Sequence, residues 1–330
     1  MSSQRVRVSV VVPAHNSPAQ VAGCLAAIRA SSGSDVEIIV ADDASTDETP
    51  EVARAAGARL VQLARNSGPA AARNAGARVA NGEVLLFLDQ DVLAAPGTIE
   101  RVVRTLQERP ELAAIFGSYD AAPVDPGVVS QFRNLLHHYI HQHGDPEAST
   151  FWAGCGAVRR EVFQSVGGFD VNLVLEDIEL GYRLRQHGHR ILLDPELQVK
   201  HAKVWTLRSM IRTDILLRAI PWAKLILRTR TAPGTLNLRP AQRWSVALTG
   251  IALALAVASP VAPFLLLPAG AALIGILALN ASFYRFLCEV RGIPFALAGV
   301  FLHLLYFTCC GLGAAWTLLG GGGDLERKGV

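Results

Sequence analysis

Acidic side chains stand where predicted strands of this chain end. Asp42 and Asp43 close the apolar run VEIIVA, and Asp89 and Asp91 flank Gln90 directly after the run GEVLLFL. Carboxylates at the strand ends of an α/β sheet converge on the crevice where such sheets bind ligands. Two Asp residues one position apart suit a hard divalent cation that also holds phosphate oxygens. The pattern predicts chemistry on a nucleotide diphosphate.

A third acidic pair, Glu176-Asp177, opens the helical stretch EDIELGYRLRQHG. A carboxylate close to such a site can serve as a general base. The alternative is that both residues stabilise a helix N-terminus, where the helix dipole favours negative charge. Both roles are compatible, since Glu176 can cap the helix while Asp177 accepts a proton.

Alternating strand and helix patterns over residues 6–118 would position these side chains. Val8–Val12 is a continuous apolar run, as expected for a strand covered on both faces. Ser45-Thr46-Asp47-Glu48 predicts a capping box that opens a helix to about Ala56. The remaining expected elements are a helix over 18–31, strands at Val36–Ala41, Leu60-Val61 and Val84–Leu88, and a helix from Pro69 to near Asn81-Gly82. The order predicts a Rossmann-like series with a parallel sheet.

The rest of the polar part is less regular. Residues 119–150 lack clear periodicity and predict a loop or mobile segment over a site. Residues 151–201 predict a Gly-rich turn, a helix and a short strand at Arg190–Leu193.

Two long stretches carry no Asp, Glu, Lys or Arg, namely Trp244 to Tyr284 and Gly292 to Gly323. A membrane helix needs about 20 apolar residues. The first stretch therefore predicts two short spans with a break near Ser259–Pro263, and the second predicts one. A buried pair of soluble helices is the alternative, and the span count stays open between two and three.

Basic residues gather ahead of these stretches, where residues 206–230 predict an amphipathic helix on a membrane surface. An ordinary surface helix packed on the domain is the alternative. The cluster favours a cytosolic side and anionic lipid. Its members are Arg208, Arg212, Arg218, Lys224, Arg228, Arg230, Arg239 and Arg243. The net charge of +3 is too small to suggest a nucleic-acid partner. The N-terminal apolar run, interrupted by Pro13 and His15, does not predict a signal peptide.

Five ordered segments give the chain a family resemblance: VVVPAHN, VADDASTDET, NSGPAAARNAGARVANGEVLLFLDQD, WAGCGAVRREVFQSVGGFD and EDIELGYRLRQHG. Over residues 6–205 the chain resembles a family 2 glycosyltransferase, of the membrane-anchored bacterial type. The resemblance implies an α/β GT-A fold, in which a nucleotide-binding Rossmann-like half merges with an acceptor half. C-terminal transmembrane helices follow it.

The resemblance also implies a nucleotide-sugar donor site. Pro13, Ala14 and Asn16 match the loop beside the base and ribose, and Asp42 and Asp43 match the pair near the base. A turn role for the Asp pair is the alternative. Arg73 matches a position that reaches the diphosphate or holds the D-x-D loop, or else forms a surface ion pair.

Asp89-Gln90-Asp91 matches the D-x-D motif of the family. Asp91 is then the expected ligand of Mn²⁺ or Mg²⁺, with Asp89 facing the ribose or sugar and standing as a second candidate ligand. His201 matches a position by the diphosphate or metal, and imidazole suits Mn²⁺.

On the acceptor side, the resemblance implies that Asp177 is the general base and that Glu176 lies beside it against the acceptor. Trp152 and Gly154 match the acceptor loop, and Trp152 would stack on a sugar or fill the core. The R-W of Arg243-Trp244 lacks the Gln of the processive Q-x-x-R-W motif in its expected place. Processive polymer synthesis is therefore not expected.

The expected protein is an inverting glycosyltransferase that moves one sugar from a nucleotide-diphosphate sugar to a hydroxyl. Its expected acceptor is lipid-linked or membrane-associated. The expected process is cell-envelope glycan or glycolipid synthesis. The alternative is a non-catalytic nucleotide-sugar-binding subunit. Dehydrogenase and P-loop motifs are absent from the sequence. The expected domains are 1–205 (glycosyltransferase), 206–242 (interfacial) and 243–330 (two or three spans and a tail), in a multi-pass protein of the cytoplasmic membrane with its catalytic domain in the cytosol.

Overall fold

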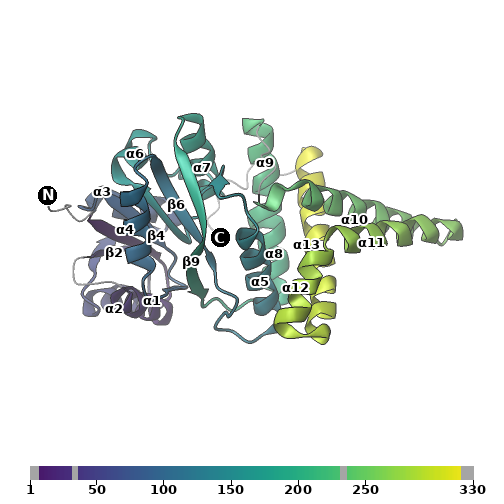
Figure 1. Cartoon of the computed structure of the whole chain (residues 1–330), viewed down its shortest axis with the longest axis horizontal. Coiled ribbons are helices and arrows are strands. Elements are labelled where there is room, and N and C mark those ends of the chain that lie inside the picture. The colour runs from purple at the N-terminus through teal and green to yellow at the C-terminus, as the bar shows by residue number, and fades with distance from the viewer. Residues whose placement is uncertain (1–6, 32–35, 231–235, 321–330) are drawn as a thin grey trace. The chain divides into compact units, whose positions relative to one another are not determined.

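The computed structural model describes residues 7–31, 36–230 and 236–320. Within them the chain forms two compact units (Figure 1). The first unit comprises residues up to Asp125 together with His141–Lys203. The second comprises Pro126–Ile140 and the residues from Val204 onward. The second predicted domain boundary, at 242, lies inside the second unit and stays a prediction.

One mixed sheet forms the centre of the first unit. Its strand order in the described chain is β3-β2-β1-β4-β8-β6-β9-β5, with β7 added beside β9. The strands are β1 (Val8–Ala14), β2 (Glu37–Asp42), β3 (Arg59–Gln62), β4 (Val84–Leu88), β5 (Val92–Ala94), β6 (Leu112–Tyr119), β7 (Glu147–Ala148), β8 (Cys155–Arg159) and β9 (Arg190–His201).

The sheet changes direction at β8. The strands β1 to β4 pair in parallel, as predicted. β8 then pairs antiparallel with both β4 and β6, and β5 pairs antiparallel with β9. The expectation of a parallel sheet therefore holds for one half only, because β8 and β5 reverse direction. Since β1 and β4 are buried along their whole length, their side chains can be apolar on both faces.

Helices cover the sheet of the first unit. They are α1 (Pro18–Ala30), α2 (Thr49–Ala55), α3 (Pro69–Val79), α4 (Thr98–Glu108), α6 (Arg160–Ser165) and α7 (Glu176–Gln186). Helix α3 lies very close to the sheet, because a Cβ at Gly76 would come within 2.5 Å of Val11 Cγ1. This close approach places Arg73, one turn earlier in α3, at the ends of β1 and β4.

Two local predictions were wrong. No capping box opens α2; the Ser45 hydroxyl instead accepts from the Asn16 N–H, and Asp47 accepts from the Thr49 N–H. Residues 119–150 contain helix α5 (Val128–Gln142), which crosses from the second unit into the first. Its three His residues, His137, His138 and His141, are among the polar side chains that hid the helical period in the sequence.

The second unit is helical. Its further elements are α8 (Leu207–Arg212), the π-helical η1 (Thr213–Ala219), α9 (Ile220–Thr229), η2 (Leu236–Leu238), α10 (Pro240–Ala258), η3 (Pro263–Leu265), α11 (Leu266–Leu279), α12 (Ala281–Arg291) and α13 (Ile293–Leu318). The predicted helix over 206–230 is confirmed as α8, η1 and α9. Its membrane contact stays a prediction.

Two helices of the described chain are long and apolar enough to cross a membrane, α10 with 19 residues and α13 with 26. A third crossing is possible only if the pair Pro263–Leu279 and Ala281–Arg291, bent by 63°, forms one span. The predicted break near Ser259–Pro263 is the turn between α10 and α11. The predicted tail lies outside the described residues.

Candidate active site

Arg73 joins the two acidic motifs of the first unit. Its Nη2 donates to Asp89 Oδ1 at 2.6 Å, and its Nη1 donates to Glu176 Oε1 at 2.5 Å. The guanidinium is buried and lies over the Phe169 ring, 5.7 Å from the ring centroid. One cation thus holds the strand end after β4 against the start of α7. The predicted alternative of a surface ion pair is wrong, since the Arg73 side chain is only 7% exposed.

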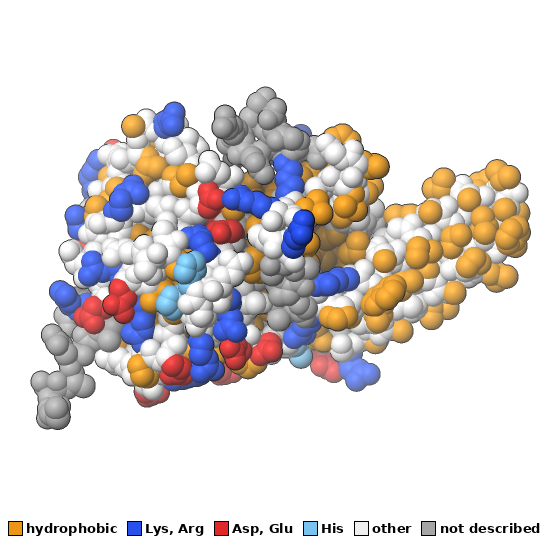
Figure 2. Space-filling view, turned by 90° about the horizontal axis from the view of Figure 1, so that it is seen from above, with side chains coloured by type: hydrophobic (Ala, Val, Ile, Leu, Met, Phe, Trp, Pro, Cys, Tyr) orange, Lys and Arg blue, Asp and Glu red, His pale blue; other side chains and the backbone are white. Residues whose placement is uncertain are grey.

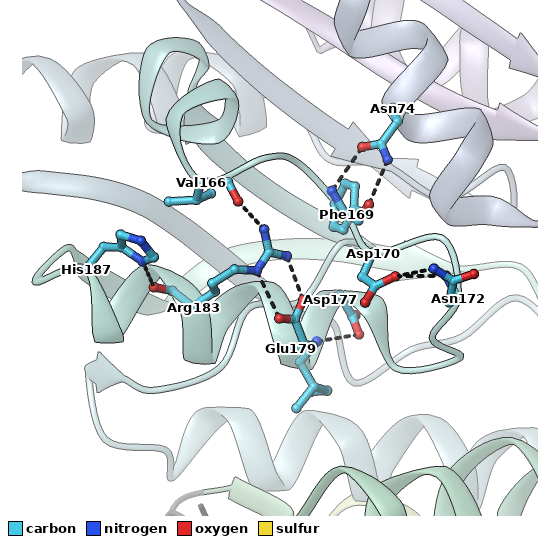
Figure 3. Close-up of polar contacts among 10 residues, drawn as sticks. Asn74, Val166, Phe169, Asp170, Asn172, Asp177, Glu179, Arg183 and His187 are labelled. Atoms are coloured by element: carbon cyan, nitrogen blue, oxygen red, sulfur yellow. Dashed lines mark hydrogen bonds and ion pairs between the residues drawn. The ribbon is translucent and has the colours of Figure 1, made fainter. Parts of the chain in front are cut away.

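The carboxylates around Arg73 outnumber it. Burial raises the pKa of Glu176 to about 7, with Arg73 opposing the rise and Asp177 adding to it. Burial also raises the pKa of Asp177, although the backbone N–H groups of Ala153 and Ile178 donate to its carboxylate. Figure 3 shows the second of these bonds at the first turn of α7. The site therefore holds unneutralised acidic groups that are away from bulk water.

Asp91 and His201 are brought together at the pairing of β5 with β9. His201 Nε2 lies 3.8 Å from Asp91 Oδ2, and both side chains are largely buried. Burial, and then the neighbouring Asp89, raise the pKa of Asp91 to about 6. A carboxylate oxygen and an imidazole nitrogen at this spacing fit a divalent ion of the Mn²⁺ type, which would relieve the penalty on the Asp91 charge.

No group of three or more His, Cys, Asp or Glu side chains with metal-ligand spacing occurs among the described residues. Asp89 is turned toward Arg73, so its Oδ1 is already engaged. The described residues therefore offer two candidate ligand atoms, and a bound ion would need oxygens from a ligand to complete its coordination.

The middle residue of the motif, Gln90, ties two loops together. The His15 backbone N–H donates to its Oε1 at 2.9 Å, and its Nε2 donates to the Ser17 hydroxyl at 3.0 Å. Asn16 has the left-handed φ of 45° and accepts from the Thr46 N–H. Pro13 and Ala14 lie at the end of β1, not in a loop, and Asn16 lies just after it. This end of β1 is thereby held next to the loops after β2 and β4.

Asp42 and Asp43 differ in their surroundings. Both Asp43 oxygens accept backbone N–H groups at 2.7 Å, from Ser67 and Gly68 at the start of α3. Asp42 is fully buried, and its Oδ1 has no hydrogen-bond partner among the described residues. Asp43 therefore shapes the loop that leads into α3. The base-contact prediction stays a prediction for both.

Trp152 is part of an aromatic group next to His201. Tyr119, at the end of β6, stacks on His201 with ring centroids 4.1 Å apart and meets the Trp152 ring edge-on at 4.9 Å. A Cβ at Gly154 would lie 2.5 Å from the Trp152 ring, so only glycine lets the indole take this position. The predicted acceptor loop thus lies close to the predicted metal site.

Sequence reasoning missed Tyr119 and the role of Asn74. The Asn74 side chain donates to the Phe169 carbonyl and accepts from the Phe169 N–H, which holds the loop before α7 (Figure 3). Asn74 adjoins Arg73 in the quoted motif, so its position was a usable signal. Tyr119 stands at the edge of the segment that was predicted to be a loop.

Comparisons with known proteins find glycosyltransferases. The model of the family described as Glycosyl transferase family 2 matches residues 9–167. An uncharacterized glycosyltransferase of Haemophilus influenzae is 27% identical over 219 residues, covering 62% of this chain and 71% of that protein. A validoxylamine A glucosyltransferase of Streptomyces hygroscopicus is 30% identical, covering 54% of this chain and 48% of that protein. The chain thus spans about half the length of this second relative.

A solved structure shares the fold. The mannosyltransferase PcManGT of Pyrobaculum calidifontis, in complex with GDP-Man and Mn²⁺, has a TM-score of 0.61 with this chain. The likeness covers 96% of this chain and 88% of that one, at 21% sequence identity. The predicted α/β GT-A fold is confirmed.

Proposed function

The chain carries a family 2 glycosyltransferase domain, and from this premise we propose that it transfers a single sugar from a nucleotide-diphosphate sugar to an acceptor hydroxyl with inversion at the anomeric carbon. The observation that supports this most strongly is the Arg73 bridge. It holds a donor-side carboxylate, Asp89, and an acceptor-side carboxylate, Glu176, on one buried guanidinium. A single displacement needs donor and acceptor at such a fixed separation.

Asp177 is the proposed general base. Its carboxylate oxygens are oriented by the N–H groups of Ala153 and Ile178, and burial raises its pKa toward the range where a carboxylate takes a proton effectively. In the proposed step the acceptor hydroxyl gives its proton to Asp177 while its oxygen attacks the anomeric carbon. The bond to the leaving diphosphate breaks on the opposite face. Glu176 stays paired with Arg73 and keeps the first turn of α7 in place.

The donor site is proposed to be metal-dependent, with Asp91 and His201 as the protein ligands. A bound Mn²⁺ or Mg²⁺ supplies positive charge against the leaving diphosphate. Arg73 is proposed as a positioning residue, because its bond to Asp89 fixes the carboxylate that would face the sugar. The segment with Pro13, Ala14 and Asn16, together with Gln90, Asp42 and Asp43, is proposed to bind the nucleoside.

The acceptor is proposed to be lipid-linked or otherwise membrane-associated, in cell-envelope glycan or glycolipid synthesis at the cytoplasmic membrane. Support comes from α10 and α13, which have the length and composition of membrane helices. Trp152 and Gly154 offer a partly buried indole face for a sugar ring.

Nucleotide binding tests the proposal. UDP, GDP, dTDP and CMP are titrated into the detergent-purified full chain with and without Mn²⁺. We expect one nucleotide to bind in a metal-dependent way, Asp91→Asn to lose the metal dependence, and Glu111→Gln, an exposed control, to keep it. Binding of none of the four contradicts the proposal.

Turnover distinguishes the enzyme from a non-catalytic nucleotide-sugar-binding subunit. Such a subunit would bind the nucleotide and show no sugar transfer with any membrane extract as acceptor. Asp177→Asn would change none of its measured properties. The enzyme loses transfer in that variant and keeps nucleotide affinity.

A further inference from the structure

Helix α13 has one packed face and one bare apolar face. Its 26 residues give a length of about 39 Å, more than a bilayer core of about 30 Å requires. Exposed apolar side chains recur every four residues in its first and last parts and form a stripe. The stripe consists of Ile293, Leu297, Phe301, Leu312 and Trp316, each 56 to 67% exposed.

The packed face of α13 lies against helices that carry charges. A Cβ at Gly313 would come within 2.4 Å of the Ala219 Cβ, so α13 touches the junction of η1 and α9. Near the middle of α13, the Tyr306 ring lies 5.9 Å from the Arg133 guanidinium of α5. Arg133 in turn is paired at 2.9 Å with Asp214 of η1.

The helices that flank α13 also expose charged side chains to the surroundings. The exposed members on α8 and α12 are Arg208, Arg212, Arg285, Glu289 and Arg291. If α13 crossed a bilayer, its middle would lie at the midplane and these flanking helices would enter the hydrocarbon with it. Exposed charges at that depth are costly and rare. The length and hydropathy of α13 alone do not include this cost, because the charges belong to the neighbouring helices α8 and α12.

The α10–α11 hairpin itself is almost free of charge. It carries no charged residue beyond Arg243 and projects crosswise from the group of α5, α8, α12 and α13 (Figure 1). Hydrophobic side chains cover the visible face of the hairpin (Figure 2). Its two arms meet through a polar contact near the base, where Asn280 Nδ2 donates to the Ser245 hydroxyl at 2.8 Å. The tip is apolar, with Val257 and Val261 81% and 93% exposed.

We propose that α13 lies in the plane of the membrane interface, with its exposed stripe on the hydrocarbon, and that the α10–α11 hairpin is the only part of the described chain that enters the bilayer core. The partner of the α13 stripe is the boundary between lipid headgroups and acyl chains. Both ends of α13 are then on one side of the membrane, the side of α8 and α12, whose charges stay in water and among headgroups.

Label depth along α13 tests this in the full chain reconstituted into phosphatidylglycerol-containing vesicles. Nitroxide labels are placed singly at Ile293→Cys, Phe301→Cys, Leu312→Cys and Leu318→Cys. The background replaces Cys288 and Cys310, the partly exposed native thiols, with Ala. We expect one shallow depth at all four positions and a greater depth at Val257→Cys in the hairpin. Phe301 and Leu312 labels deeper than those at Ile293 and Leu318 would contradict an in-plane α13, and a shallow Val257 label would contradict the inserted hairpin.

Sidedness gives an independent test in intact cells. Glu289→Cys and Leu319→Cys stand just before and just after α13, and both positions are exposed. A membrane-impermeant maleimide should treat them alike, with both labelled only after the cells are opened. Labelling of one but not the other in intact cells would mean that α13 crosses the membrane, and would overturn the proposal.

Discussion

Each unit of this chain buries one arginine against carboxylate and an aromatic ring, but the balance of charge differs. In the first unit, Arg73 forms ion pairs with Asp89 and Glu176 and lies near Asp177, so negative charge is in excess. In the second, Asp214 is the one carboxylate paired with Arg133 among the described residues, and Arg133 lies over the Trp205 ring, with Arg218 nearby. A matched pair can only hold helices together. An excess of buried carboxylates leaves groups able to take a proton or a cation.

The largest effect should come from removing one of the excess carboxylates. Asp177→Asn keeps the size and the acceptor oxygen of the side chain but cannot accept the hydroxyl proton. We expect turnover to fall by about 10² to 10⁴-fold, with nucleotide affinity unchanged. Initial rates measure this, with a sugar donor of the nucleotide that the titration selects. Glu179→Gln, in the same helix and paired with Arg183, is the matched control. Turnover within a few-fold of the parent in Asp177→Asn would remove it as the base.

The next effect should be on stability in the balanced pair. Arg133→Met leaves Asp214 fully buried without its counter-charge, which costs about 3 to 5 kcal/mol. Thermal unfolding in detergent measures the loss. The double variant Arg133→Met, Asp214→Leu should recover most of it, and turnover per folded molecule should stay near normal. Arg73→Met should instead lose nucleotide affinity as well as stability. If Arg73→Met and Arg133→Met changed nucleotide affinity and stability in the same way, the proposed difference between the two units would be wrong.

A pH dependence should follow from the excess carboxylates of the first unit. The pKa values of Asp91 and Glu176 are raised to about 6 and about 7, so the folded state holds protons that the unfolded chain releases near pH 4 to 4.5. Without ligands, the stability contributed by these groups should therefore fall as pH rises from about 4 to about 7. Mn²⁺ with the nucleotide should flatten this fall, because it favours ionised Asp91. Melting temperatures across this range check it, and a contribution that rises with pH would contradict the assignment.

The smallest effect should come from an exposed pair. Arg185 and Glu147 lie 2.8 Å apart but are 35% and 48% exposed, so water and salt screen them. Arg185→Gln should change the free energy of unfolding by at most about 1 kcal/mol and leave turnover unchanged. Chemical denaturation of the two proteins side by side is sufficient. A loss of unfolding free energy as large as that of Arg133→Met would show that burial does not explain the difference between these two ion pairs.

Local sequence signals predicted much of the first unit. Val8–Ala14 and Val84–Leu88 are strands because their runs are apolar on both faces, and the strand-end positions of Asp89 and Asp91 followed from that. The antiparallel β8 could not be predicted, because strand direction depends on which distant strands pair. The helix Val128–Gln142 was missed because its buried face includes Ser130, Arg133 and Asn134, which are polar.

The sequence predicted which residues make up the candidate site better than it predicted how their side chains are oriented. The motifs named Arg73, Asp89, Asp91, Glu176 and Asp177, but not that Asp89 turns to Arg73 while Asp91 faces His201. That division depends on the pairing of Val92 with His201 across β5 and β9, a long-range register. The charge-free stretches likewise predicted apolar helices. The charges that surround α13 come partly from α12, just before it, and partly from α5, η1 and α8, which are far away in the sequence.

The π-helical turn at Thr213–Ala219 sets the rotational phase between α8 and α9. An α-helix turns by about 100° per residue, and the wider i→i+5 turn absorbs one extra residue while the helices on either side keep their phase. Deleting one residue here would let the segment close into an ordinary α-helix, with Trp222 and Leu225 still on the faces that they now occupy. Inserting one residue would instead swing both side chains by about 100° around the axis. In this segment a one-residue deletion should therefore be tolerated better than a one-residue insertion.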